Sequence, residues 1–182
     1  EIYDRIWDAL VLYENTDNPT IQSFSLIGRY HGQYWSVHAD QDDARDWENR
    51  RKIFGFSSKW FQDFELQAQM YLDLENGSIY DGLYVAFIEW SPEGRDFSLS
   101  VGRLDYLFTG YERSTSSKKI NTIERGLVVN QVMPAEVVGV HAKGRQGRCS
   151  YQVGVFSRSI EEEFSDFDSG AAAVIGGALD SP

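Results

Sequence analysis

A cluster of cations marks the stretch from Glu112 to Leu127, ERSTSSKKINTIERGL, in a chain whose formal net charge is −11. The cationic residues are Arg113, Lys118, Lys119 and Arg125. Hydroxyl side chains precede the two lysines at Ser114, Thr115, Ser116 and Ser117. Ammonium groups and hydroxyl donors suit phosphate or carboxylate oxygens, and rings of Lys or Arg are how anion pores select their ions. The stretch therefore indicates a site where Lys118 and Lys119 meet an anion.

The same charges also have a purely structural interpretation, ion pairs along a surface loop. Carboxylates balance the four cations at Asp105, Glu112, Glu124 and Glu136. Exposed pairs of this kind are common and contribute little to stability. From the residues alone, both interpretations stay open.

The cations belong to a long segment without strand periodicity, Asp105 to Ala135. So long a connection in a compact domain is usually a lid or a binding loop, or else disordered. Its apolar residues, among them Phe108, Ile120 and Leu127, are too many for disorder. We expect a folded loop with a short helical turn near Ile120.

The elements on either side of this loop alternate with period two, which predicts β-strands. The clearest case is FELQAQMYLDL, where the residues from Phe64 to Leu74 are apolar at every second position. The pattern recurs in IQSFSLIGRYHGQY, RRKIFGFSSKWF, DFSLSVG, EVVGVHAK and CSYQVGVFS. Strands of this length exceed the roughly 5–6 residues of globular proteins and match the roughly 9–11 needed to cross a bilayer.

The connections and the aromatic residues favour a membrane barrel over a soluble sandwich. Short links at Gln62-Asp63, at SPEGRD (91–96) and at KGRQGR (143–148) alternate with longer ones, as in outer-membrane barrels. Aromatic residues near the expected strand ends would form an interfacial girdle; they are Trp35, Trp60, Phe61 and Trp90. The fold class predicted is all-β, an antiparallel transmembrane β-barrel of porin type. A soluble antiparallel sandwich, which also alternates, is the alternative.

Three segments depart from this pattern. GLYVAFIEW (82–90) is apolar on both faces apart from Glu89, so it needs cover on its inner side, and the segment 105–135 is the expected cover. Residues 1–20 are expected to be a separate N-terminal segment, either periplasmic or a short helix with Ile2, Ile6, Leu10 and Tyr13 along one stripe. The run GAAAVIGGAL near the end is expected to be an unpaired strand.

Composition and motifs argue against several other functions. A chain of this negative charge lacks the basic surface that nucleic-acid binding requires. Cys149 is the single cysteine, which excludes internal disulfides, and the three histidines lack metal-ligand spacing. No catalytic pair with supporting groups is present, so we expect no enzyme, no cofactor and no metal.

Three motifs resemble the phosphate-selective porin family of bacterial outer membranes. They are the xRRxxxGFxxKxFxDFExxxxxxLDL run at 50–74, the IEW-P element at 88–92 and the TSSKKxxTIERxL element at 115–127. The likeness spans roughly residues 20–180. It implies a sixteen-stranded antiparallel barrel, usually a homotrimer, whose third extracellular loop folds into the lumen as a constriction. Residues 21–182 would then supply about eight strands, the N-terminal half of such a barrel.

The resemblance also implies roles for particular residues. Lysines at the constriction and arginines along the inner wall give the family its anion selectivity. The constriction or anion-binding residues here would be Arg113, Ser116, Ser117, Lys118, Lys119 and Arg125, in a loop of about 105–135. The lumen-wall residues would be Arg29, Arg51 and Lys59, which have the inward strand phase.

The function expected is passive diffusion of small solutes, above all anions such as phosphate, across the bacterial outer membrane. The partners expected are the anions in transit, outer-membrane lipid and two further copies of the chain. The carboxylate content, 28 Asp and Glu against 17 Lys and Arg, also favours a general or cation-tolerant porin. The alternative from a different class is a soluble secreted β-sandwich that binds carbohydrate through its Tyr and Trp residues.

Overall fold

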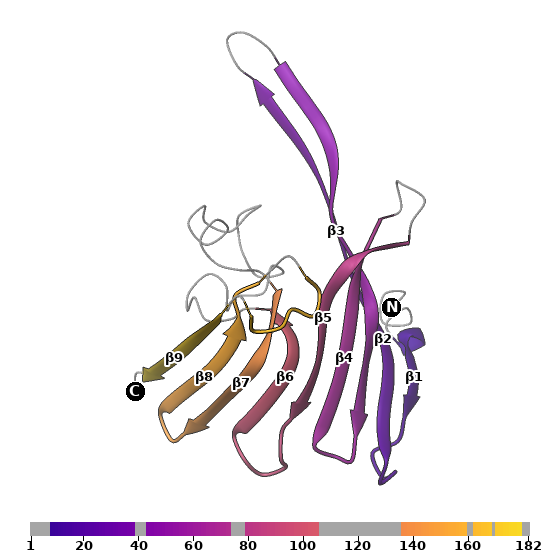
Figure 1. The fold of residues 1–182 in the computed structure, drawn as a ribbon. Helices are drawn as coiled ribbons and strands as arrows, with labels where there is room; N and C mark the ends of the chain where they lie inside the picture. The colour runs from indigo at the N-terminus through magenta and orange to yellow at the C-terminus, as the bar shows by residue number, and fades with distance from the viewer. Residues whose placement is uncertain are drawn as a thin grey trace.

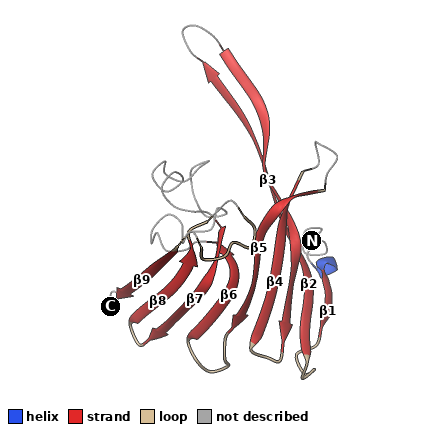
Figure 2. Ribbon diagram, in the orientation of Figure 1, coloured by secondary structure: helices blue, strands red, loops and turns tan. Residues whose placement is uncertain are grey.

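The described part of the chain forms a single antiparallel β-sheet (Figures 1 and 2). The computed structural model describes residues 8–38, 43–73, 79–105, 136–159, 162–168 and 170–179. The strands are β1 (Val11–Glu14), β2 (Ile21–His38), β3 (Asp43–Trp60), β4 (Phe64–Leu72), β5 (Tyr80–Trp90), β6 (Phe97–Asp105), β7 (Glu136–Gln146), β8 (Cys149–Ser157) and β9 (Ala171–Leu179). Each strand pairs with the next in sequence order, so β1 and β9 are the two edge strands of an open sheet. The prediction of an all-β antiparallel fold of porin type is confirmed.

Strand register sorts the alternating residues onto two faces. On one face, Leu66 lies opposite Ile88, Ile88 opposite Val101, and the row continues to Val140 and Val155. We call this the apolar face. On the other face, Ser57 lies opposite Gln67, Glu89 opposite Ser100, and Ser100 opposite His141. We call this the polar face. Because a pleated strand alternates its side chains, the period-two pattern of the sequence is enough to produce this division.

The connections differ in length between the two ends of the sheet. At one end β3 turns into β4 through Phe61 and Gln62, which both have positive φ (50° and 68°). At the same end β7 and β8 run to within two residues of each other, so the turn is only Gly147 and Arg148, with Gly147 at φ 61°. We call this end of the sheet the turn end and the opposite end the loop end. The alternation of short and long connections follows the prediction.

The aromatic residues of the turn end form a belt along the strand ends. Trp60 ends β3, Phe64 begins β4, Trp90 ends β5 and Phe97 begins β6. The rings of Trp90 and Phe97 meet edge to face with centroids 6.1 Å apart. Amphipathic aromatic rings at this position are typical of a membrane interface. Trp35, which was also predicted to belong to such a girdle, lies far from this belt, near the other end of β2, where it pairs with Asp46 of β3.

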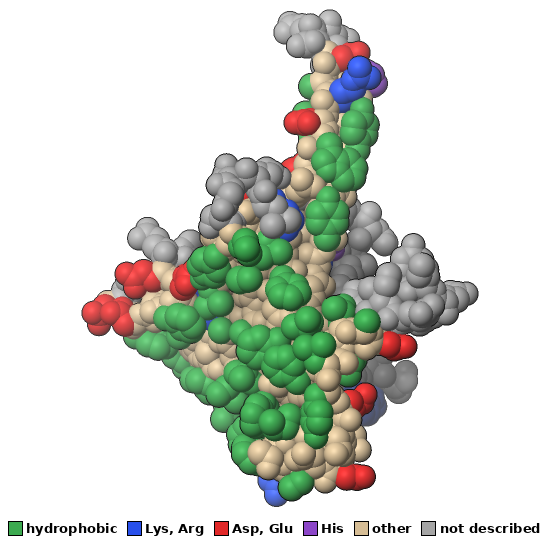
Figure 3. All heavy atoms as spheres, turned by 90° about the vertical axis from the view of Figure 1, so that its right-hand side faces the viewer, with side chains coloured by type: hydrophobic (Ala, Val, Ile, Leu, Met, Phe, Trp, Pro, Cys, Tyr) green, Lys and Arg blue, Asp and Glu red, His purple; other side chains and the backbone are tan. Residues whose placement is uncertain are grey.

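The β2–β3 hairpin is longer than the rest of the sheet. Both strands have 18 residues, and their far halves project beyond the loop end as a two-stranded arm (Figure 1). Hydrophobic side chains lie along this arm as well as over the body of the sheet (Figure 3). Tyr30, Tyr34 and Trp47 are among the exposed side chains of the arm.

Two predictions for the ends of the chain are wrong. For residues 1–20, expected to be periplasmic or a short helix, the helical alternative fails at Tyr13: only residues 8–10 of the described part are helical, and Tyr13 belongs to β1, which pairs with β2. The run near the C-terminus was expected to be unpaired, yet β9 pairs with β8 over its whole length, from Ala171 to Leu179. In both cases backbone pairing with a neighbouring strand outweighs the local pattern.

The inner side of β5 is covered in part by neighbouring strands. Phe87 packs against a cluster of Leu104, Val137 and Phe156, which come from β6, β7 and β8. All three cluster residues are buried. The need for cover on the polar face, inferred from the sequence of 82–90, is therefore met at Phe87 by these side chains. The expected cover, segment 105–135, lies outside the described residues except for Asp105.

None of the described helical residues belongs to a helix long and apolar enough to cross a membrane.

Candidate functional site

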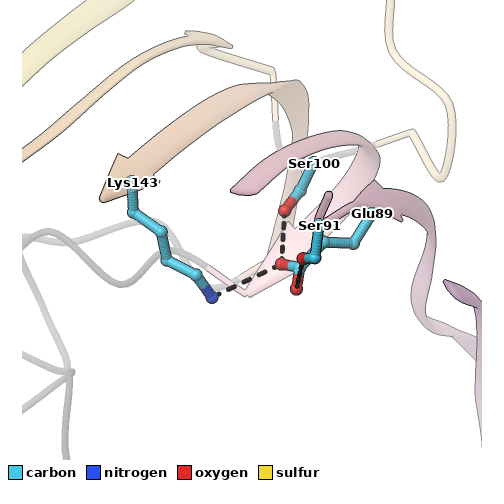
Figure 4. A network of polar contacts seen from close by, with 4 residues as sticks. All are labelled: Glu89, Ser91, Ser100 and Lys143. Carbon is cyan, nitrogen blue, oxygen red and sulfur yellow. Dashed lines mark hydrogen bonds and ion pairs between the residues drawn. The ribbon is translucent and has the colours of Figure 1, made fainter. Parts of the chain in front are cut away.

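A polar network on the polar face centres on the carboxylate of Glu89 (Figure 4). Glu89 comes from β5, Ser100 from β6 and Lys143 from β7, and strand pairing places them side by side because Glu89 lies opposite Ser100, and Ser100 opposite His141. Two residues further along β7, Lys143 falls on the same face. The network is thus assembled by register rather than by any one segment.

The Glu89 carboxylate accepts three contacts from side chains around it. Ser100 Oγ donates to Glu89 Oε2 over 2.8 Å, and Ser91 Oγ donates to Glu89 Oε1 over 3.2 Å. The ammonium of Lys143 lies 3.3 Å from Glu89 Oε2. The Glu89 side chain is 22% exposed and that of Lys143 is 50% exposed. The acid is therefore held in place by two hydroxyls, whereas the lysine reaches into open space from one side.

Two cavities meet at this network. The loop-side cavity, of about 220 Å³, is lined by Arg29, Gln67, Gln69, Tyr84, Val85, Phe87, Glu89, Ser100, Leu104, Asp105, His141, Lys143 and Phe156. The turn-side cavity, of about 980 Å³, is lined by Glu89, Ser91, Arg95, Asp96, Phe97, Ser98, His141, Lys143, Gly144, Arg145, Ser150, Tyr151, Gln152, Gly176, Gly177 and Ala178. Glu89, His141 and Lys143 line both. A solute moving along the polar face between the two ends would pass these three side chains.

A second group of polar contacts lies at the loop end of the polar face. Tyr84 donates its hydroxyl to Asp105 Oδ2 over 3.1 Å, and Tyr71 donates to Glu136 Oε1 over 3.3 Å. The two tyrosine rings meet edge to face with centroids 5.3 Å apart. Asp105 and Glu136 were counted in the sequence as partners for the loop cations; each of them also accepts a hydrogen bond from a wall tyrosine. The last residue of β6, Asp105, and the first residue of β7, Glu136, are thereby hydrogen-bonded to the wall.

The predicted wall residues occupy different places. Arg29 lines the loop-side cavity. Arg51 lies opposite His31, with 3.5 Å between Arg51 Nη1 and His31 Nδ1, and lines neither cavity. Lys59 is exposed near the turn end, opposite Glu65. The structure thus brings Arg29 into the neighbourhood of Glu89 and Lys143 and keeps the other two apart from it.

The predicted constriction residues lie outside the described residues. They are Arg113, Ser116, Ser117, Lys118, Lys119 and Arg125. Their role in anion binding stays a prediction.

The network at Glu89 was not predicted as a site. Ser98, Ser100, His141 and Lys143 were expected only as polar residues of alternating strands, and Glu89 only as the exception in an apolar strand. A polar residue isolated in an apolar strand was the one available indication. Within the described residues no group of three or more His, Cys, Asp or Glu side chains is arranged to hold a metal ion.

Comparison with known proteins identifies the family. A family model described as phosphate-selective porin O and P matches residues 24–177, most of the chain. A search of curated proteins found no match.

Proposed function

The chain belongs to the phosphate-selective porin O and P family, and from this premise we propose that it lines a passive diffusion channel for small anions, such as phosphate, in the bacterial outer membrane. The observation that supports the proposal most is the division of the sheet into an apolar and a polar face. The apolar face suits lipid and the polar face suits a water-filled lumen. The proposal includes a homotrimer, as the family resemblance implies.

The half-exposed side chains of the apolar face support membrane insertion. Ile88 is 51% exposed, Val101 49% and Val140 43%. A contiguous row of such residues on a soluble protein would mark a binding surface or an aggregation hazard. In a bilayer the same row contacts acyl chains at no cost. This favours a membrane protein over the soluble carbohydrate-binding sandwich, which would need a second sheet packed on this face.

The polar face supports passage of solutes rather than catalysis. Its two cavities share Glu89, His141 and Lys143 in their linings, and each lining contains both cations and carboxylates. Such a lining weakly holds small charged solutes and lets them leave again, as conduction requires. Selectivity for anions would come from Lys118 and Lys119, supported by Arg113, Arg125, Ser116 and Ser117.

Planar-bilayer recording of the protein tests the proposal. In a KCl gradient the reversal potential should show anion preference, and the double variant Lys118→Ala/Lys119→Ala should shift it towards cations because two positive charges leave the narrowest part of the path. Arg45→Ala, which removes a cation from the projecting hairpin, is the matched control and should leave the reversal potential unchanged.

Two results would contradict the proposal in different ways. A protein that forms no pore would contradict the channel itself. Cation preference that the double lysine variant leaves unchanged would refute the anion assignment and favour the general or cation-tolerant porin that the net charge of −11 also fits.

A further inference from the structure

We propose that Ser98 and Lys143 form an oxyanion-binding subsite in the turn-side cavity, and that Glu89 limits how strongly it binds. The subsite rests on the proposed function and adds to it a second place, apart from the segment 105–135, where the permeating anion is held. Its ligand would be a small oxyanion with several acceptor oxygens, with inorganic phosphate as the probe.

Strand pairing places the two groups next to each other. Ser98 of β6 lies directly opposite Lys143 of β7, and Lys143 lies opposite Gln152 of β8. Directly opposite residues have their Cβ atoms about 4.5–5.5 Å apart, so one tetrahedral anion can contact both side chains. All three residues line the turn-side cavity.

The Ser98 hydroxyl is evidence for a ligand because it is buried and makes no hydrogen bond with the described residues. Ser98 is 6% exposed, and its Oγ has no hydrogen-bond partner in the described part of the chain. A buried hydroxyl without a partner is unfavourable, so such groups in proteins usually have a partner, which includes bound water or a ligand. The serines around it are different: Ser100 and Ser91 donate to Glu89, and Ser150 donates to the carbonyl of Ala178.

Lys143 can bind an anion because the Glu89 carboxylate has other hydrogen-bond donors. The carboxylate keeps its hydrogen bonds from Ser91 and Ser100 when the ammonium turns away. The lysine side chain is half exposed and flexible, so a small movement of its ammonium exchanges the carboxylate for an anion in the cavity. A charge-assisted hydrogen bond to that anion replaces the one it leaves.

Charge around the cavity favours an anion by a narrow margin. The lining contains the cations Arg95, Lys143 and Arg145 and the carboxylates Glu89 and Asp96, a formal net charge of +1. Replacement of Glu89 by Gln would raise it to +2 and remove the competitor for Lys143. Glu89 therefore keeps the subsite weak, as a channel needs, since an anion held tightly would block the path.

The experiment is block of the chloride current by inorganic phosphate, recorded in planar bilayers with phosphate added from the turn end. Ser98→Ala and Lys143→Met should each raise the half-blocking concentration about tenfold, the size expected for one hydrogen bond to a charged group. Glu89→Gln should lower it severalfold. Lys143→Arg should retain block, because the cation is kept.

The matched control is Ser57→Ala, a serine on the same face that lines neither cavity. It should leave block unchanged. The appearance of open channels that conduct chloride, whatever the size of the conductance, shows in each variant that the channel has assembled.

The outcomes separate the two proposals. Anion preference in the unaltered protein, with phosphate block that none of the Ser98, Lys143 and Glu89 variants changes, overturns the subsite and leaves the proposed function standing. A rise in half-blocking concentration for Glu89→Gln also overturns it, because the sign is opposite. An unaltered protein without anion conductance overturns the proposed function and the subsite together.

Discussion

At the scale of single residues, Gly102 shows how tightly β5 and β6 approach each other behind the site. Its φ is +137°, a conformation that residues with a side chain rarely adopt. A Cβ atom on Gly102 would lie 2.2 Å from the carbonyl oxygen of Ala86 and 2.7 Å from the Cα of Phe87. Those contacts are with backbone atoms, which cannot turn aside. The pairing of β5 with β6 that brings Ser100 to Glu89 therefore depends on a glycine here.

Gly102→Ala should accordingly destabilise the protein by at least about 1–3 kcal/mol, the cost of inserting a methyl group where there is no space. The free energy of unfolding, measured by urea titration in phospholipid vesicles, checks this. Gly177→Ala is the control, because its Cβ would meet its nearest neighbour, the Ser150 carbonyl oxygen, at an ordinary 3.5 Å. Equal stability of the two variants would show that β5 and β6 can move apart freely.

At the scale of elements, the segment 162–168 is clamped to the loop end of β5. Arg103 is 8% exposed and donates to backbone carbonyls on both sides: to Leu83 over 3.0 Å from Nε, and to Glu162 and Glu163 over 3.1 and 3.0 Å from Nη1. In return the Glu163 carboxylate accepts hydrogen bonds from the Tyr80 hydroxyl and from the Leu83 amide, the latter over 3.0 Å. The connection between β8 and β9 is thereby fixed to a strand far away in the sequence.

The clamp should loosen in acid. The hydrogen bond from Tyr80, and then that from Leu83, hold the pKa of the Glu163 carboxyl below its usual range. A carboxyl whose pKa is lower in the folded state stabilises the fold above the unfolded pKa, about 4.3, and this contribution is lost as the pH falls through the lower folded pKa. The attachment of 162–168 should therefore be complete at pH 6 and weaken below about pH 4.

A nitroxide on the exposed residue 164 reports this attachment by electron paramagnetic resonance. The label is placed by Phe164→Cys in a Cys149→Ser background, since Cys149 is a free exposed thiol. The mobile spectral component should grow as the pH falls, and in Glu163→Gln it should be independent of pH. A pH response that persists in Glu163→Gln would assign the effect to another group.

At the scale of the whole molecule, one sheet separates two environments. Residues that are neighbours in the sequence, such as Leu66 and Gln67, lie on opposite faces: Leu66 opposite Ile88 on the apolar face, and Gln67 on the wall of the loop-side cavity. A single position in a strand thus decides whether a side chain meets lipid or solute. The aromatic belt at the turn end marks where one boundary of the bilayer would lie.

The same charged substitution should therefore have different costs on the two faces. Leu66→Arg should destabilise the folded protein in phospholipid vesicles by about 1–2 kcal/mol, between the costs at the interface and at the midplane, because Leu66 lies just inside the aromatic belt. Gln67→Arg should leave the stability nearly unchanged. Urea unfolding in vesicles measures both. Equal costs would show that the face carrying Leu66 does not contact lipid, and the channel proposal would lose its main support.

The strands could be predicted from the sequence because their cause is local. Period-two alternation in FELQAQMYLDL and the turn residues after each strand specify strands, faces and short connections without knowledge of the partners. The strand at Val11–Glu14 could not be predicted in this way, because four residues show too little alternation and only pairing with β2 defines them. Its N-terminal neighbours led instead to the expectation of a helix.

By itself, then, the sequence determined the class of fold, the two faces of each strand and the family, because each depends on residue order alone. The tertiary structure decided which polar residues share a site. Glu89 meets Ser100 and Lys143 because β5, β6 and β7 pair in one register. That register depends on backbone hydrogen bonds between strands, and β7 is separated from β5 and β6 by the long segment 106–135. The cations of ERSTSSKKINTIERGL first drew attention to anion binding. The proximity of Ser98 and Lys143 follows only from the pairing of β6 with β7, because no cluster in the sequence contains both residues.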